Sequence, residues 1–171
     1  SISVEPKYSD PNPDMYTTNV KDLIKVTATY KYGKTETVTD YTAIGYTAKS
    51  TAKQDVAITY TKDNVTQKKQ ITFPAAPVNI RLITKPTKNT MSLQWDTQSD
   101  AVRYKVKREK LSTDGTVLSS NIFDTVNASY YDVGLETNSC YRYSVCAISS
   151  TNYSSAWSTS FKETTLPDVP K

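Results

Sequence analysis

The chain has 171 residues, a formal net charge of +4, 37% hydrophobic residues and no histidine. Without histidine it lacks the side chain that most often transfers protons near neutral pH and the commonest nitrogen ligand for metals. Its two cysteines cannot form a four-sulfur zinc site. Its 21 basic and 17 acidic side chains form no basic stripe of the kind that binds a phosphate backbone. We therefore expect a chain that is not an enzyme and that takes no cofactor, no metal ion and no nucleic acid.

The composition favours strands over helices. The chain contains 13 tyrosines together with many threonines and valines, residues that are typical of β-strands. No segment of about ten residues shows a convincing helical periodicity, and no apolar run approaches the roughly 18 to 20 residues of a membrane helix. There is no initiator methionine and no signal-peptide pattern. We expect an all-β part of a longer polypeptide, without a membrane partner.

Hydrophobic and polar residues alternate in the first part of the chain. Ile24, Val26 and Ala28 share one face of a predicted strand, as expected when one side of a sheet is buried. Gly33 supplies the positive φ angle of a tight turn after this strand. Further inward residues and a second turn follow at Val38–Tyr41, Val56–Tyr60, Asp63–Asn64 and Ile71–Phe73. Short alternating strands separated by turns indicate an antiparallel sandwich.

This first part resembles the bacterial immunoglobulin-like repeat over about residues 2–73. The resemblance rests on an ordered set of a V-x-A-x-Y strand, a glycine turn, a V-T-D-Y segment, another glycine and a last alternating strand. These features are Val26–Tyr30, Gly33, Val38–Tyr41, Gly45 and Val56–Tyr60. The resemblance implies a sandwich that serves as a spacer or adhesion module without catalytic residues. Such repeats occur in Gram-positive surface proteins, secreted modular enzymes and phage virion proteins.

A proline-containing segment predicts a domain boundary after Phe73. Proline cannot donate a backbone hydrogen bond to a sheet and stiffens the chain, so Pro74 and Pro77 suit a short joint. We therefore expect two domains, residues 1–73 and 74–171. The second domain shows its own strand residues and a hairpin turn, at Ile80–Leu82, Met91–Trp95, Tyr104–Val106, Asp114–Gly115 and Tyr141–Ala147. The expected fold class is two tandem immunoglobulin-like β-sandwiches.

The second domain resembles a fibronectin type III domain over nearly its whole length. The matching residues are Trp95, Tyr104–Arg108, Ser129–Leu135, Tyr141 and Thr164–Pro167. The resemblance implies that Trp95, Tyr104 and Tyr141 lie in the core, and that the Tyr141 hydroxyl bonds to backbone a few residues upstream. Thr137–Asn138 departs from the family, which commonly has Pro-Gly there, so a different turn is expected at this point.

The two cysteines are expected to be unpaired. Cys140 and Cys146 lie on one predicted strand, where six residues span roughly 20 Å. A disulfide tolerates a Cα separation of only about 7 Å. Both are one position out of phase with the inward residues, so we expect two outward-pointing thiols that are free or sheltered.

Residues 10–14 have the D-x-N-x-D spacing with which a calcium-binding loop begins. Asp10, Asn12 and Asp14 supply the oxygen atoms, but the following glycine and the distal glutamate are missing. The prolines between them stiffen the segment. The sequence therefore predicts an extended proline-rich segment and no metal site.

Three aromatic residues are the candidate ligand-binding residues. Tyr32 lies at a predicted hairpin tip, and Tyr153 and Trp157 lie near the last loop, without an evident place in the core. Exposed rings on sandwich loops can stack on sugars or anchor a protein partner. The alternative is that Tyr153 and Trp157 fold back over the sandwich edge or pack between the domains.

These features predict an accessory module of a surface-exposed or secreted bacterial or phage protein. Its partners would be the neighbouring domains of a longer chain, which it would space, and a cell-wall or surface glycan, which it would bind weakly. It could also be appended to a larger modular enzyme. The alternative is a structural part of a phage virion, in a tail, a fibre or a capsid decoration. The unpaired cysteines favour the virion, because virions assemble in a reducing cytoplasm. The expected location is extracellular, at the cell surface or in a virion.

Overall fold

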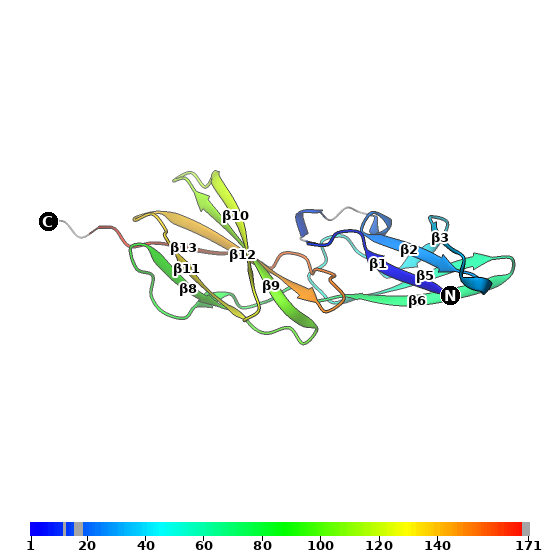
Figure 1. Ribbon diagram of the computed structural model, residues 1–171. Helices are drawn as coiled ribbons and strands as arrows, with labels where there is room; N and C mark the ends of the chain where they lie inside the picture. The colour runs from blue at the N-terminus through cyan, green and yellow to red at the C-terminus, as the bar shows by residue number, and fades with distance from the viewer. Residues whose placement is uncertain (12, 16–18, 169–171) are drawn as a thin grey trace.

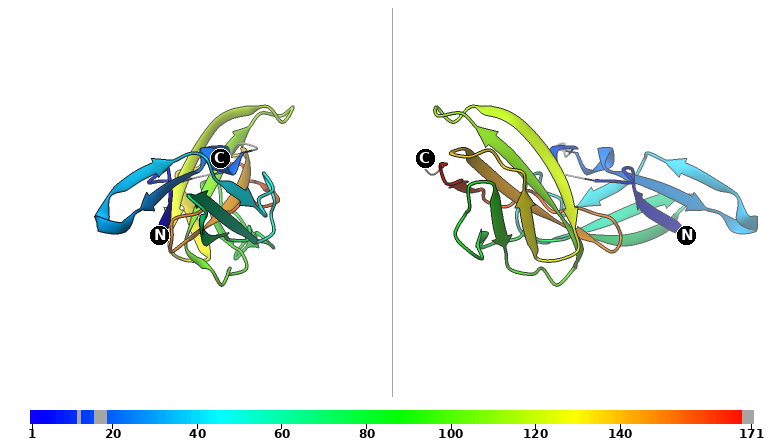
Figure 2. Two further views of the ribbon diagram at one scale, coloured as in Figure 1. Left: turned by 90° about the vertical axis from the view of Figure 1, so that its right-hand side faces the viewer. Right: turned by 60° about the vertical axis from the view of Figure 1, so that its left-hand side comes forward.

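The computed structural model describes residues 1–11, 13–15 and 19–168, which form two β-sandwiches lying end to end (Figures 1 and 2). The regular elements of these residues are the strands β1 to β13 and three short 3₁₀ helices. None of the described residues forms a helix that is long and apolar enough to cross a membrane. The expected all-β sandwich fold is confirmed.

The first sandwich consists of two three-stranded antiparallel sheets. Their strand orders are β1-β2-β3 and β4-β5-β6. The strands are β1 (Ile2–Pro6), β2 (Ile24–Thr29), β3 (Thr35–Val38), β4 (Thr42–Ile44), β5 (Gln54–Lys62) and β6 (Val65–Phe73). The 3₁₀ helices are η1 (Pro13–Met15), η2 (Val20–Asp22) and η3 (Lys31–Gly33). Helix η1 lies between β1 and η2 in the sequence.

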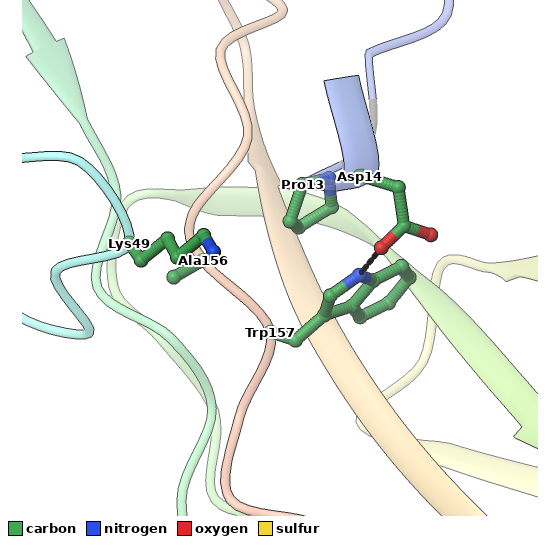
Figure 3. Close-up of a pocket in the computed structure, with 5 residues that line it drawn as sticks. All are labelled: Pro13, Asp14, Lys49, Ala156 and Trp157. Atoms are coloured by element: carbon green, nitrogen blue, oxygen red, sulfur yellow. Dashed lines mark hydrogen bonds between the residues drawn. The ribbon is translucent and has the colours of Figure 1, made fainter. Parts of the chain in front are cut away.

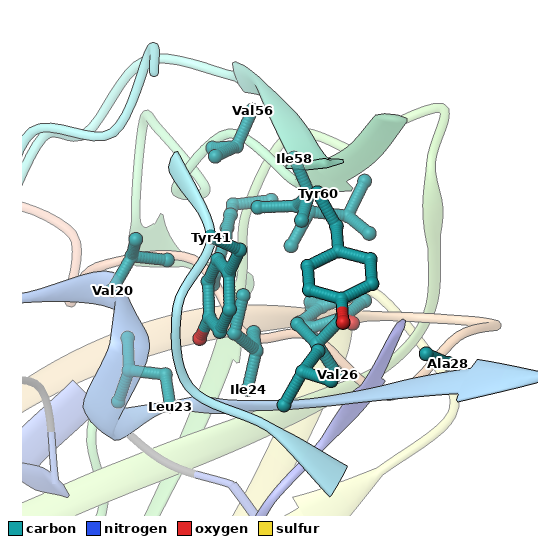
Figure 4. Packing of buried hydrophobic residues seen from close by; sticks show 13 residues of the cluster. Val20, Leu23, Ile24, Val26, Ala28, Tyr41, Val56, Ile58 and Tyr60 are labelled. Atoms are coloured by element: carbon teal, nitrogen blue, oxygen red, sulfur yellow. The ribbon is translucent and has the colours of Figure 1, made fainter. Parts of the chain in front are cut away.

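The core of the first sandwich follows the alternation in the sequence. Ile24, Val26 and Ala28 of β2 are buried and face Val56 and Ile58 of β5 across the sandwich (Figure 4). The residues between them on β2 are more exposed. Burying each of these larger side chains contributes about 1.5 to 3 kcal/mol, which is enough to fix which face of the strand points inward.

Two glycines of the first sandwich occupy places that other residues fit poorly. Gly33 has a φ angle of 81° in the turn between β2 and β3, where the preceding Tyr32 also has a positive φ angle of 72°. Gly45 follows β4 with a φ angle of 102°. A Cβ atom on Gly45 would lie 2.4 Å from the carbonyl oxygen of Asp55, so a side chain there would collide with the backbone of β5.

The second sandwich consists of a three-stranded and a four-stranded antiparallel sheet. Their strand orders are β11-β8-β7 and β10-β9-β12-β13. The strands are β7 (Arg81–Leu82), β8 (Thr90–Gln94), β9 (Ala101–Leu111), β10 (Val117–Thr125), β11 (Ser129–Val133), β12 (Cys140–Ser149) and β13 (Phe161–Thr164). Strands β9 and β12 are the long central pair of the larger sheet, and β10 and β13 form its two edges.

The second core contains the three aromatic residues that the sequence placed there. Trp95, Tyr104 and Tyr141 are buried, and the rings of Trp95 and Tyr104 meet edge to face at 5.5 Å. The backbone N–H of Glu136 donates a hydrogen bond of 3.0 Å to the Tyr141 hydroxyl. The expected hydrogen bond between the Tyr141 hydroxyl and upstream backbone is confirmed, because Glu136, its donor, lies five positions before Tyr141.

A buried carboxylate also lies in the second core. Asp132 accepts a hydrogen bond of 2.8 Å from the hydroxyl of Tyr143 and one of 2.7 Å from Arg108. Burial raises the pKa of Asp132, while Tyr143 and Arg108 stabilise its anion and oppose that rise. These two donors satisfy the carboxylate inside the sandwich, so Asp132 is a structural residue of the core.

Candidate functional site

The connection between the sandwiches is held by both of them. Pro74, Ala76 and Pro77 are buried. The N–H of Ala76 donates to the carbonyl oxygen of Thr51 at 2.8 Å, in the first sandwich. Just after this segment, the carbonyl oxygen of Val78 accepts a hydrogen bond of 3.0 Å from the N–H of Asp96 in the second sandwich. Near this segment the chain passes from the hydrophobic cluster of the first sandwich to that of the second. The division into domains 1–73 and 74–171 stays a prediction.

A buried lysine lies at the centre of the contact between the sandwiches. The side chain of Lys105, on the outer face of β9, is only 3% exposed. Its Nζ atom forms ion pairs with Asp10 of the first sandwich at 2.8 Å and with Asp124 of β10 at 3.2 Å. Arg103 lies 2.6 Å from Asp124 and 3.5 Å from Asp10. A buried ammonium group is costly without opposite charge, so burial of Lys105 depends on these carboxylates.

The charges of this cluster stabilise the contact between the sandwiches. The hydrogen bond from Lys105 lowers the pKa of Asp10 below its ordinary value, with a smaller contribution from Arg103. Burial opposes this shift. Because the charged form of Asp10 is the one that Lys105 stabilises, the ionised carboxylate favours docking of this segment.

A second acid of the same segment binds two residues of the second sandwich. Asp14 accepts a hydrogen bond of 2.9 Å from Lys107 and one of 2.8 Å from the indole Nε1 of Trp157 (Figure 3). Lys107 also places its Nζ atom 4.6 Å from the centre of the Trp157 ring, a cation–π contact. Trp157 is therefore half-buried in the contact between the sandwiches, as the packing alternative predicted.

The turn after β12 adds hydrophobic and polar contacts with the first sandwich. Asn152 has a φ angle of 64° and donates from its amide to the carbonyl oxygens of Ser9 at 2.9 Å and Tyr8 at 3.3 Å. Tyr153 is only 4% exposed, and its ring packs at 5.0 Å on Phe73, the last residue of β6. For Tyr153 too the packing alternative is confirmed, and its use as a solvent-facing binding residue is ruled out, because its ring completes the hydrophobic cluster of the first sandwich.

Buried serines allow the chain after this turn to run beside β12. The hydroxyl oxygens of Ser155 and Ser158 accept hydrogen bonds of 2.9 Å from the N–H groups of Ala147 and Val145. The N–H groups of the same two serines donate to the carbonyl oxygens of those residues, also at 2.9 Å. This irregular segment carries Tyr153 and Trp157 to the contact. Sequence alternation gave no signal for it, since hydroxyl groups replace part of the regular ladder.

A cavity of about 460 Å³ lies beside Trp157 at the contact (Figure 3). Its lining residues are Pro13, Asp14, Lys49, Ala156 and Trp157. The Asp14 carboxylate is already engaged by Lys107 and Trp157, and this lining contains no nucleophile paired with a base. Among the described residues, the cavity is thus a hollow in the joint whose one lining acid is already engaged.

The two described acids of the calcium-like spacing form ion pairs with the second sandwich. Asp10 and Asp14 direct their carboxylates to Lys105 and Lys107, so that ammonium groups, and not a metal ion, balance their charge. Asn12, the middle residue of the pattern, lies outside the described residues. Within residues 1–11, 13–15 and 19–168, no group of three or more acidic or cysteine side chains could hold a metal ion.

Tyr32 is separated from the other two candidate residues. It is 93% exposed in the turn between β2 and β3, and this hairpin points to the end of the first sandwich that is remote from the second (Figure 1). The three aromatic residues therefore do not form one surface. Tyr32 alone of the three presents its ring to solvent.

The two cysteines are free, as expected. Cys140 is half-buried, whereas Cys146 is fully buried on the outer face of β12 opposite Lys105 of β9. The expectation of an outward position holds for Cys146, but the contact with the first sandwich covers that face. Burial raises the pKa of the Cys146 thiol to about 12 and makes it unreactive near neutral pH.

Comparisons with known proteins give a structural likeness only. No family model matches the chain, and no curated protein matches it. Similar solved structures include the fibronectin type III domain of the human collagen alpha-1(XX) chain, with a TM-score of 0.49 and 20% identity over 57% of this chain and 90% of that one. The FN5 domain of Drosophila Lar has a TM-score of 0.46 and 18% identity over 56% of this chain and 99% of that one.

Another similar structure is the third fibronectin type III domain of the human KIAA0343 protein. It has a TM-score of 0.46 and 16% identity over 57% of this chain and 87% of that one. These structures are of the type that the sequence predicts for the second half. Scores at this level establish neither a family nor a function, and the fold is argued above from the strand order and the core. The likeness of the first half to the bacterial repeat stays a prediction.

Proposed function

We propose that the chain is a non-catalytic spacer module, which holds the segments attached to its two ends at a fixed distance and angle. It would act in a surface-exposed or secreted bacterial or phage protein. The observation that carries the proposal is the charged and aromatic contact between the sandwiches. A flexible tether between independent sandwiches would need none of the contacts made by Lys105, Asp14 and Tyr153.

The contacts restrain rotation because they join several separate segments of the two sandwiches. Asp10 and Asp14 bind the outer face of β9, while Lys53 of the first sandwich forms an ion pair of 2.8 Å with Asp100 of the second. Tyr153 adds a ring contact with Phe73. A hinge about the proline-containing segment would have to break several of these contacts together.

Neutralising the two docking acids should loosen the joint. In the double variant Asp10→Asn, Asp14→Asn, the ion pairs to Lys105 and Lys107 are lost, and we expect small-angle X-ray scattering to show a broader distribution of interatomic distances. Lowering the pH should have the same effect, because the pKa of Asp10 is lower in the folded state than its ordinary value. The stabilisation of the contact by ionised Asp10 is complete above the ordinary pKa, and it is lost as the pH falls through the folded-state pKa. Loosening is thus expected only below roughly pH 4.

The matched control replaces two exposed first-sandwich acids, Asp40→Asn and Asp63→Asn. This variant has the same change in charge and should scatter like the native chain. Identical scattering of the native chain and the docking variant, at a resolution that detects bending, would contradict the proposed spacer role.

We also propose weak adhesion to a cell-wall or surface glycan through Tyr32. Its ring is 93% exposed at the far end of the first sandwich, where an aromatic face can stack on a sugar ring. In a screen of cell-wall polysaccharides, binding by the native chain should disappear in Tyr32→Ala. Binding that Tyr32→Ala retains would exclude this residue, and absence of binding would leave the spacer role alone.

The virion alternative has lost part of its support. It follows from the resemblance of the first half to repeats found in phage virion proteins, and the two unpaired cysteines favour it slightly, because an oxidising compartment would threaten free thiols. Cys146 is buried beneath the joint with a raised pKa, so it needs no reducing compartment for protection. Of the two thiols, only the half-buried Cys140 still favours this alternative.

A further inference from the structure

The edge strand β10 leaves one side of its backbone unpaired. It is the first strand in the order β10-β9-β12-β13, and no further strand lies beyond it in either view of Figure 2. In an antiparallel sheet, alternate N–H and C=O groups of such a strand point away from its neighbour. All its residues except Phe123 and Thr125 are exposed, including the side chains of Leu118 and Ile122.

The sequence of β10 lacks the features that usually block an edge. Val117–Thr125 contains no lysine, arginine or proline, and its one charge, Asp124, is bound by Arg103 and Lys105 of its own chain. The other nine-residue edge strand, β6, carries the exposed Lys68 and Lys69. Charged side chains on an edge, lysine above all, prevent it from pairing with another chain. Among the described edge strands, β10 is thus the longest without this protection.

We propose that β10 pairs antiparallel with β10 of a second copy of this chain. A shift in register between Val117 and Ser119 interrupts the regular strand, so pairing would use residues 119–125. A two-fold axis through Ile122 then places Ile122 opposite its own copy and Ser120 opposite Asp124. The two four-stranded sheets would join into one continuous sheet across the dimer.

Charge and symmetry favour a second copy in this antiparallel arrangement. A parallel pairing in register would place Asp124 beside Asp124, and like charges directly opposite one another destabilise a sheet. The antiparallel arrangement separates these two acids and brings together the apolar Ile122 side chains. It also closes on itself, because both copies use the same strand, whereas pairing of β10 with a different edge would propagate into a filament.

The position of β10 makes the pairing compatible with the proposed spacer. The first sandwich covers the outer face of β9 and β12 through Asp10 and Asp14, whereas the free side of β10 lies at the border of the sheet (Figure 2). Failure of this pairing would leave the joint contacts unchanged. Failure of the spacer proposal would likewise leave the edge available, so the two proposals are tested separately.

Molar mass across a concentration series tests the pairing. As the concentration increases, the molar mass of the native chain measured by light scattering should rise from the monomer mass of 19.1 kDa toward about twice that value. Ile122→Lys places a charge at the two-fold axis and should hold the chain at the monomer mass. Val65→Lys, on the exposed start of β6, is the matched control and should associate like the native chain. A native chain that stays monomeric throughout, or an Ile122→Lys variant that still associates, would overturn the proposal.

A disulfide identifies the register directly. Ile122→Cys should form an intermolecular disulfide on mild oxidation, because opposed residues of paired strands lie within the reach of that bond. Val65→Cys supplies a cysteine at a position that is even more exposed and lies away from the proposed contact, and it should cross-link more slowly by at least tenfold. Equal cross-linking rates for these two variants would mean random collision and would overturn the proposed register.

Discussion

Trp95→Ala is expected to lower the free energy of unfolding of the second sandwich by about 3 to 5 kcal/mol, the range for removing a large buried aromatic side chain. Trp95 is 3% exposed and packs edge to face against Tyr104. Its removal would leave a cavity between the two sheets that the surrounding strands cannot fill. Chemical denaturation, followed by the circular dichroism of the strands, measures the change.

The control for this prediction is Tyr32→Ala. Tyr32 is 93% exposed, so its removal should change the free energy of unfolding by less than about 0.5 kcal/mol. The turn itself is kept by Gly33, which this variant does not alter. Equal losses in Trp95→Ala and Tyr32→Ala would mean that the assignment of core and surface is wrong.

Tyr153→Ala should be nearly as costly and should also uncouple the sandwiches. Tyr153 belongs to the second sandwich by sequence but lies in the hydrophobic cluster of the first, against Phe73. Removing its ring should cost about 3 kcal/mol, at the lower end of the range for a buried aromatic residue. Hydrogen exchange of β5 and β12 should then show different opening free energies for the two sandwiches, where the native chain shows closer values.

Tyr153→Phe separates the role of the ring from that of the hydroxyl. The Tyr153 hydroxyl is buried and has no hydrogen-bond partner among the described residues. Removing an unsatisfied buried hydroxyl should leave stability unchanged or raise it slightly, because its desolvation has not been offset. A loss in Tyr153→Phe as large as that in Tyr153→Ala would show that the hydroxyl, and not the packing of the ring, holds this residue in place.

The sandwich fold could be predicted because its signals are local. The alternation of Ile24, Val26 and Ala28 fixes one face of a strand, and the turn at Gly33 requires a positive φ angle. Trp95 and Tyr141 stand in recognisable patterns within one half of the chain. Each of these inferences uses residues that are neighbours in sequence or that share a short motif, which is where period-two reasoning is strongest.

The joint could not be predicted in the same way. Asp10 and Lys105 are 95 positions apart, and neither shows from its neighbours that it will meet the other. A lysine on the outer face of a strand ordinarily points to solvent, whereas Lys105 is buried where Asp10 of the first sandwich and Asp124 of β10 meet it. Cys146 is buried opposite Lys105 on the neighbouring strand. The sequence predicts a loop near Tyr153, because its residues do not alternate. In the structure, serine hydroxyls replace part of the backbone ladder beside β12.

Residual dipolar couplings of the native chain in one aligning medium test the central claim most directly. If the two sandwiches form one body, a single alignment tensor should fit the backbone N–H couplings of β5 and β6 together with those of β9 and β12, in the relative orientation of this structure. Separate tensors of clearly different magnitude for the two sandwiches would show independent motion and would contradict the account of a stiff spacer.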